Sequence, residues 1–382
     1  MNKNILHTMA NNKVKNNTPK ELSKNAMAFA ALNPFVQSNL VENVEKEISG
    51  KDFIGWGNDN QYPNYLFSLY SSCATLQSVI NGTIDFIVGN ESECNVTNFQ
   101  TRMNKNDETL EDILQRLACD YLIYGGFAIQ VIRDYNNAIS EIYWIDFSKL
   151  RSDKKNEVFF YSEDWDKSFG RVKYITYPKF RTDDKNPTSI YYYKGTKTRS
   201  VYPTPIFNAS VLACEMEKKI NEFHLNELNN NFLSSKIINF NSGIPDDELK
   251  EEIERNINEK FSGTDNAGRI LISFNDNEEH KTTVENLGTD NFADRYNALA
   301  KRAKEEIFVA FRATPMIFGV PQENSGFNIA EYEESFKLYN RTTVRPMQKV
   351  LVSAFDKIFN IDGSVSIVPF SLEDNQEDTV EN

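Results

Sequence analysis

Residues 291–359 read NFADRYNALAKRAKEEIFVAFRATPMIFGVPQENSGFNIAEYEESFKLYNRTTVRPMQKVLVSAFDKIF and carry the pattern that decides the fold. Apolar side chains recur at steps of three and four on both sides of a break, a spacing that places them on one helix face. The first stripe is Phe292, Tyr296, Leu299, Ala303, Ile307 and Phe311, and the second is Ile329, Tyr332, Phe336, Tyr339, Thr343, Met347, Val350, Ala354 and Ile358. The second segment would be about 45 Å long as a helix. We therefore expect it to pack against more than one small core.

Pro346 lies inside the second stripe. Proline lacks a backbone donor and clashes with the carbonyl four residues back. The pattern predicts a long helix with a kink at Pro346.

The break between the stripes, residues 312–328, combines two kinds of residue. Pro315, Gly319, Pro321 and Gly326 disfavour regular structure. The apolar residues of the break are too apolar for an ordinary surface turn, and they are Met316, Ile317, Phe318, Val320 and Phe327. Two interpretations stay open. The break is either a loop buried in its own core, or a loop whose apolar part packs while its polar tip, Gln322, Glu323, Asn324 and Ser325, projects outward.

Composition narrows the classes of function. A chain of 382 residues with 40% hydrophobic residues can bury a large core, and its formal charge of −13 argues against tight, sequence-independent binding of nucleic acid. The four cysteines are widely spaced without a CxxC pair, so neither a zinc site nor a disulfide framework is indicated. No apolar run is long enough for a membrane span.

The N-terminal half predicts a mixed architecture. We expect residues 1–52 to form a partly disordered arm, because residues 1–26 hold five Lys and only one Glu. Two helices should meet at Ser71 and Ser72 and end at Gly89, followed by a polar turn region near 90–107 and a helix at 110–122. Short apolar runs on both sides of residues 134–137 predict a hairpin, within a mostly antiparallel region that extends to about residue 202.

The C-terminal half is dominated by helices with an insertion between them. Residues 208–232 predict a helix whose buried stripe is Leu212, Met216, Ile220, Phe223 and Leu228. Residues 236–274 predict a compact β-α-β unit. Within it, residues 246–260 hold seven acids and three bases, a net charge of −4, most of which we interpret as a solvated face. A short strand and an acidic tail close the chain.

Catalytic motifs were sought in the sequence. It contains no GxxxxGK[ST], HExxH or GxSxG, and its three histidines are scattered, so we assign no catalytic residue, metal ligand or cofactor. Asp120, Asp134, Glu141 and Asp146 could bind Mg²⁺ in a nuclease, but we favour a surface position for them. Residues 124–127, Tyr-Gly-Gly-Phe, follow a helix and precede a strand, which favours a helix C-cap over an anion site.

These segments together resemble the portal proteins of tailed bacteriophages. The most specific part is IFVAFRATPMIFGVPQENSGFNIAEYEESFKLYNRTTVRPMQKVLVSAF, similar to the family's helix, proline-glycine junction, polar loop and long helix containing Arg-Pro. GNDNQYP, DYLIYGGFAIQVIRD, EIYWIDFSKLR and NAGRILISF support it in the same order, and the resemblance covers residues 53–370.

The resemblance implies an α+β portal fold with a defined order of parts. After the arm would come a mixed wing at 53–207, stem helix 1 at 208–235, the clip at 236–288 and stem helix 2 at 289–313. The tunnel-loop region would be 314–328, followed by a long kinked helix and short strand at 329–370. An acidic tail at 371–382 would stand in place of a crown.

The resemblance also implies a function without enzymatic chemistry. Twelve copies would form a ring at one capsid vertex of the virion, assembled in the host cytoplasm, through which double-stranded DNA passes without specific binding. Gln322 to Gly326 would face that channel. The clip residues Asp246, Asp247, Glu248, Glu251 and Glu252 would dock the terminase and later a head–tail adaptor, and the ring would meet the major capsid or scaffold protein. Two alternatives stay open: a metal-dependent nuclease, and another structural protein of the capsid or head–tail region.

Overall fold

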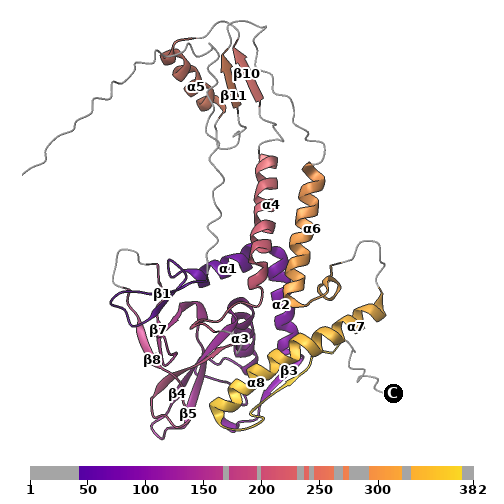
Figure 1. The fold of residues 1–382 in the computed structure, drawn as a ribbon. Coiled ribbons are helices and arrows are strands. Elements are labelled where there is room, and N and C mark those ends of the chain that lie inside the picture. The colour runs from indigo at the N-terminus through magenta and orange to yellow at the C-terminus, as the bar shows by residue number, and fades with distance from the viewer. Residues whose placement is uncertain are drawn as a thin grey trace, which may run out of the picture. The chain divides into compact units, whose positions relative to one another are not determined.

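The computed structural model describes residues 43–166, 172–195, 199–229, 236–240, 245–261, 270–274, 292–320 and 328–371. These residues fall into two compact units (Figure 1). The larger contains the described parts of 39–224 and 289–382, and the smaller contains those of 225–288. No helix among the described residues is long and apolar enough to cross a membrane.

Three helices form the centre of the larger unit: α1 (Tyr62–Ser72), α2 (Ala74–Val88) and α3 (Leu110–Tyr124). Cys73 has an extended backbone that separates α1 from α2, and Gly89 caps α2, so the predicted helix pair is confirmed. Thr109 and Asp112 begin α3 with a capping box. Helix α2 buries Leu76, Val79, Ile80, Thr83, Phe86, Ile87 and Val88.

Two antiparallel sheets accompany these helices, which confirms the predicted hairpin and antiparallel region. Strands β4 (Gly126–Arg133), β5 (Ile139–Trp144) and β9 (Thr188–Lys194) pair in the order β5-β4-β9. The second sheet has the order β1-β2-β6-β7-β8. Its strands are β1 (Glu45–Glu47), β2 (Ile54–Trp56), β6 (Leu150–Ser152), β7 (Val158–Tyr161) and β8 (Ile175–Pro178). Residues 45–47, predicted to belong to the arm, thus form an edge strand.

The expectation of a polar turn region at 90–107 is wrong in part. Strand β3 (Glu91–Cys94) lies there and pairs antiparallel with β12 (Val365–Val368), and a 3₁₀ turn, η1 (Thr97–Phe99), follows. The sequence of β3, Glu-Ser-Glu-Cys, has no alternation of apolar and polar residues, and only Cys94 of this strand is buried. Its partner strand β12 comes from the other end of the chain, so the residues next to β3 in the sequence do not indicate that a strand forms there.

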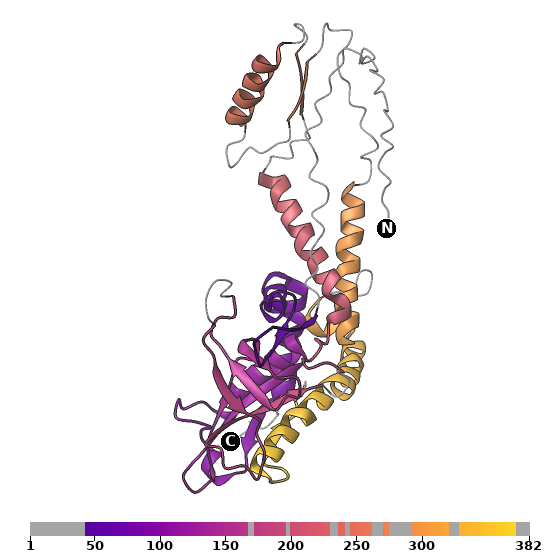
Figure 2. The same cartoon turned by 60° about the vertical axis from the view of Figure 1, so that its left-hand side comes forward.

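The long helices have the predicted order. They are α4 (Val211–Asn229), α6 (Phe292–Phe311), α7 (Ile329–Tyr339) and α8 (Arg345–Phe359). Between α7 and α8 lies a π-helical turn, η6 (Asn340–Val344), which ends two residues before Pro346 in the first turn of α8. Pro346 has no N–H to offer the Thr342 carbonyl, which explains a wider turn at this point. Figure 2 shows the helical segment bending between α7 and α8.

The smaller unit has the predicted β-α-β order. Strands β10 (Lys236–Phe240) and β11 (Ile270–Phe274) pair in parallel, from Lys236 opposite Ile270 to Phe240 opposite Phe274. Helix α5 (Asp247–Phe261) lies between them in the chain. A parallel pair needs such a crossover connection, because a tight hairpin can only join antiparallel strands.

Gly125 connects α3 to β4 and confirms the predicted C-cap. It has a left-handed conformation, φ 82°, and its N–H donates to the Tyr121 carbonyl. A Cβ atom at this position would lie 2.1 Å from the Thr204 carbonyl oxygen. The position therefore requires glycine for its conformation and for the close approach of another backbone segment.

We predict that Gly125→Ala destabilises the larger unit by about 3 kcal/mol or more, because strain at positive φ is added to a backbone clash. Gly50→Ala is the matched control. Gly50 has φ 74° with no atom within 4 Å of an added Cβ, so only the conformational cost of about 1 kcal/mol applies. Urea unfolding of both variants checks the difference. Equal losses would show that the approach of Thr204 has no energetic importance.

Candidate functional site

The first part of the candidate site is the pair of helices α4 and α6, which run side by side (Figures 1 and 2). The Ser210 hydroxyl donates to the Glu306 carbonyl at 2.8 Å, and the Phe207 and Phe311 rings stack at 6.0 Å. Farther along, Phe223 stacks on Tyr296 with ring centroids 4.7 Å apart. The C-terminal half of α6 is the buried half, through Ala303, Ile307, Phe308 and Phe311.

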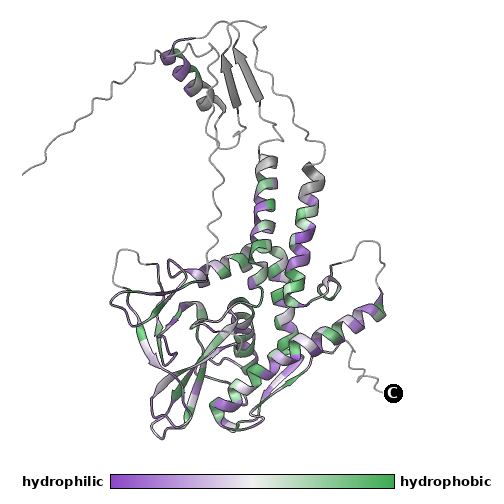
Figure 3. Ribbon diagram, in the orientation of Figure 1, coloured by the Kyte–Doolittle hydropathy of each residue, from purple (hydrophilic) through white to green (hydrophobic). Residues whose placement is uncertain are grey.

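Both helices also expose apolar side chains. Leu212 is 55% exposed, although it was predicted to be buried, and Leu299 of the first α6 stripe is 41% exposed. Val309, next to the buried Phe308, is 74% exposed. Figure 3 shows hydrophobic residues along both helices. The buried face of α4 contains Ala213, Cys214, Glu217 and Ile220 instead of Leu212.

Glu217 explains why α4 turns this face inward. Its carboxylate accepts hydrogen bonds from the Thr75 N–H at 3.2 Å and from the Cys73 thiol at 3.4 Å. Both donors lie at the N-terminus of α2, where the first N–H groups have no partner within the helix and the dipole favours an anion. Periodicity alone assigns a glutamate to the solvent side, so this contact had no signal in the sequence.

The apolar part of the break packs into the core of the larger unit. Residues Pro315–Phe318 form a 3₁₀ turn, η5, that begins at Pro315 and ends at Gly319 with φ 74°. Met316 and Ile317 are buried. Phe318 packs against Gly82 of α2, where a Cβ atom would lie 2.9 Å from its ring. Val320 is 41% exposed, and Phe327 lies outside the described residues. The predicted packing is therefore observed for residues 316–318. Since both interpretations of the break include this packing, it does not decide between them.

Residues of α2 beyond Gly82 form hydrogen bonds with the long helix that follows the break. The hydroxyls of Thr83 and Tyr339 lie 2.8 Å apart, and both side chains are buried. Near the end of α2, the Gln348 amide donates to the Ile87 carbonyl at 2.9 Å. The Phe318 and Tyr339 rings meet edge to face at 5.9 Å. Helix α2 thus contacts η5, α7 and α8.

The predicted loop tip lies outside the described residues, as do Pro321 and Gly326. Gln322, Glu323, Asn324 and Ser325 belong to this gap, between Val320 and Asn328. Asn328 begins α7, and its side chain accepts from the Ala330 N–H at 3.2 Å. The predicted role of the tip stays a prediction.

The predicted clip residues lie on α5 of the smaller unit. Asp246 precedes the helix and accepts from the Leu249 N–H at 2.9 Å, and Asp247 pairs with Lys250 at 2.9 Å. These two residues and Glu248, Glu251 and Glu252 are all exposed. Their arrangement gives an acidic first half of the helix, which also suits the positive end of its dipole.

The surface position favoured for the four carboxylates of the N-terminal half is wrong for two of them. Asp120 and Glu141 are buried, and Glu141 binds Lys105 and the Tyr143 hydroxyl. Asp134 is exposed and closes the β4-β5 turn by accepting from the Asn136 N–H. Among the residues that the structure describes, no three or more His, Cys, Asp or Glu side chains gather as a metal site.

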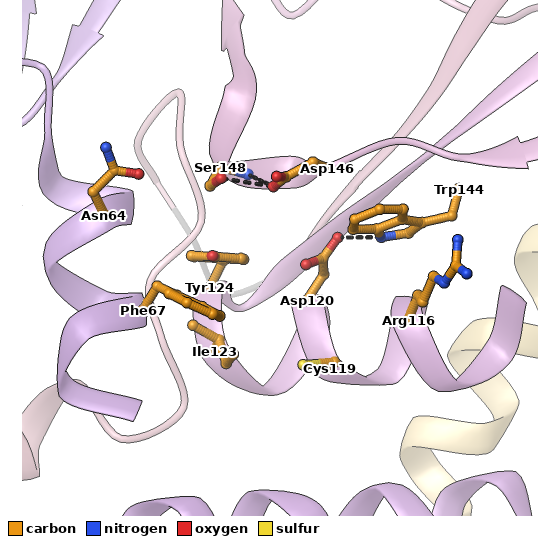
Figure 4. Close-up of a pocket in the computed structure, with 10 residues that line it drawn as sticks. All are labelled: Asn64, Phe67, Arg116, Cys119, Asp120, Ile123, Tyr124, Trp144, Asp146 and Ser148. Atoms are coloured by element: carbon orange, nitrogen blue, oxygen red, sulfur yellow. Dashed lines mark hydrogen bonds between the residues drawn. The ribbon is translucent and has the colours of Figure 1, made fainter. Parts of the chain in front are cut away.

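Asp120 and Asp146 line a pocket of about 390 Å³ in the larger unit (Figure 4). Its walls come from α1, α3, the end of β5 and the turn η2 (Phe147–Lys149). They are formed by Asn64, Phe67, Arg116, Cys119, Asp120, Ile123, Tyr124, Trp144, Asp146 and Ser148. The pocket combines three aromatic side chains with carboxylates from two elements.

Burial raises the pKa of Asp120 well above the usual range of a carboxyl group, and the negative charge of Asp146 raises it further. The Trp144 indole N–H donates to Asp120 at 2.7 Å and opposes this effect. Asp146 accepts from the Ser148 N–H at 3.0 Å, which begins η2. Arg116 forms its ion pair with Glu108 and lies over the Trp144 ring.

Comparison with known proteins identifies the family. The family model described as Phage portal protein matches residues 96–373, which is more than half of the chain. The chain therefore belongs to the phage portal protein family, as its sequence pattern predicted. A search of curated proteins by sequence gives no match.

Solved structures with a similar fold include chains from a gene transfer agent particle. A chain from the virion of a native gene transfer agent particle aligns at 15% identity and TM-score 0.54, over 80% of this chain and 83% of that chain. A chain from the neck of the native particle, computed with C12 symmetry, aligns at 16% identity and TM-score 0.52, over 80% and 84%. At these identities the likeness shows the fold.

A double-mutant cycle tests the contact between α2 and α7. We predict that Thr83→Val lowers the free energy of unfolding by about 1–3 kcal/mol, because it leaves the buried Tyr339 hydroxyl without that partner. Tyr339→Phe should lower the free energy of unfolding less in the Thr83→Val protein than in the wild-type protein. Urea unfolding of the four proteins gives the coupling energy. A coupling of zero would mean that this hydrogen bond does not stabilise the unit.

Proposed function

We propose that this portal protein assembles into a closed ring of identical copies, twelve in the particle, at one vertex of a phage capsid. Double-stranded DNA passes through the ring when it is packaged and ejected. Family membership and the similarity to a neck chain computed with C12 symmetry support this function. The ring belongs to the virion and is assembled in the host cytoplasm.

The exposed apolar residues of α4 and α6 carry the ring proposal. Leu212 and Val309 are 55% and 74% exposed, although each lies on a helix that buries one of its faces. Burying a large aliphatic side chain contributes about 1.5–3 kcal/mol, so contact with another copy is favourable. A head-to-tail contact between identical copies generates a ring when its rotation closes.

The parts of the chain receive roles consistent with this ring. Residues 53–207 form the wing, 208–235 and 289–313 the stem, and 236–288 the clip. Gln322 to Gly326 form the tunnel loop next to the DNA. The chain carries a formal charge of −13, so a channel built from it binds a polyanion weakly and lets it slide in both directions.

The partners follow from the same assignment. The acidic face of α5, with Asp246, Asp247, Glu248, Glu251 and Glu252, docks the terminase during packaging and a head–tail adaptor afterwards. The capsid or scaffold protein contacts the outside of the ring. The energy for DNA movement comes from the terminase, and the portal acts as a conduit without chemistry of its own.

We expect the wild-type protein to form rings with a central hole in negative-stain microscopy, and the Leu212→Lys, Val309→Lys double variant to remain monomeric. Each added ammonium must stay hydrated, which opposes burial at the contact. Light scattering gives the mass. Ile175→Lys changes an apolar residue of β8 that is 58% exposed and serves as control. A wild-type monomer that cleaves DNA with Mg²⁺ would instead support the nuclease alternative.

Deletion of Gln322–Ser325 tests the tunnel loop. We expect intact rings, since the deleted residues lie beyond the packed turn η5, but reduced packaging or retention of DNA. DNA protected from nuclease inside assembled particles measures this effect. A variant with the four residues replaced by Gly-Ser-Gly-Ser keeps the length and separates the chemistry of the tip from its reach. Normal filling by the deleted ring would contradict a tunnel role.

A further inference from the structure

The pocket described above offers two kinds of contact to another side chain. Phe67, Tyr124 and Trp144 provide aromatic surface, and Phe67 is 50% exposed. Asp146 provides a hydrogen-bond acceptor. Its Oδ1 atom accepts from the Ser148 hydroxyl, and its Oδ2 atom lies 3.9 Å from the Lys149 ammonium. Lys149 itself pairs more closely with Glu163, at 2.5 Å. An aromatic ring that bears an O–H group matches this combination.

A side chain of this kind projects from the turn between β4 and β5. Tyr135 is fully exposed, whereas the backbone around it is firmly held. Asp134 accepts from the N–H groups of Asn136 and Ala138 at 2.8 and 2.9 Å. Arg133 donates to the Asn137 carbonyl at 2.9 Å. The turn therefore presents Tyr135 with little loss of conformational entropy on binding.

Tyr135 cannot reach the pocket of its own chain. It lies at the turn end of the hairpin, whereas Trp144, a wall of the pocket, ends β5. The strand from Ile139 to Trp144 spans about 17 Å, and it pairs with β4 along this length, with one bulge at Ile132 and Arg133 near the turn. Each copy thus carries the knob, Tyr135, and the hole, the pocket, at opposite ends of the β4-β5 hairpin.

We propose that Tyr135 of one copy inserts into the pocket formed by α1, α3, β5 and η2 of the next copy in the ring. Its ring packs against Phe67 and Trp144, and its hydroxyl donates to the Asp146 carboxylate. The contact is head-to-tail, because knob and hole are different surfaces, and repetition of such a contact is what closes a ring. This inference rests on the proposed ring and adds the residues that join neighbouring wings.

Photocrosslinking tests the contact in the full-length protein. Tyr135 is replaced by p-benzoylphenylalanine, an aromatic residue that crosslinks on irradiation, and the products are separated on a denaturing gel. We expect a ladder of covalent multimers, with crosslinked peptides that contain Phe67 or residues 110–124 of another copy. Phe67→Asp in the same chain should lower the yield about tenfold, because it adds a charge at the edge of the aromatic wall. Ser68→Asp, at the neighbouring exposed position of α1, should leave it unchanged.

The outcomes separate this inference from the proposed function. Rings without a ladder, or a ladder whose peptides lie outside the pocket, would overturn the inference and leave the ring intact. Equal yields for Phe67→Asp and Ser68→Asp would also overturn it. Crosslinks to capsid protein alone would show that Tyr135 faces the shell. If the wild-type protein forms no ring under any condition, the proposed function itself fails.

Discussion

The burial of helix α2 is the constraint on which the larger unit depends. Near its N-terminus the Thr75 N–H donates to Glu217 of α4. Its middle contacts Phe318 of η5 and Tyr339 of α7, and its last carbonyls accept from Gln348 of α8. A buried helix end without such partners would leave costly unpaired backbone groups. Helix α4 of the proposed stem and the turn η5 before the proposed tunnel loop therefore each stabilise one part of α2 as well.

Local patterns predicted the elements of this fold but not all of their faces. Apolar periodicity located both long helices, and the glycine at 125 marked the end of α3, because these signals depend only on neighbouring residues. The buried face of α4 was misjudged by about one position. Leu212 fits the apolar stripe better than Glu217 does, but the two donors at the start of α2 make the glutamate the better inward residue.

The same limit applies to the candidate site. The apolar character of residues 316–318 correctly indicated packing, whereas Val320, which belongs to the same predicted apolar set, is 41% exposed. The burial of Asp120 could not be foreseen. Its partner Trp144 lies on a strand beyond α3, and only the fold brings the carboxyl group and the indole N–H together. Strand β3 was missed for a related reason, since β12, its partner, is at the other end of the chain.

The bend at the π-helical turn follows from the two points at which the long helix meets α2. Tyr339 and Gln348 are nine residues apart, about 13 Å along a helix, whereas Thr83 and Ile87 are separated by only about 6 Å along α2. The helices must therefore cross, and η6 with Pro346 lies between the two contacts. The direction of α7, which begins directly after the proposed tunnel loop, is thus set by Tyr339, and that of α8 by Gln348.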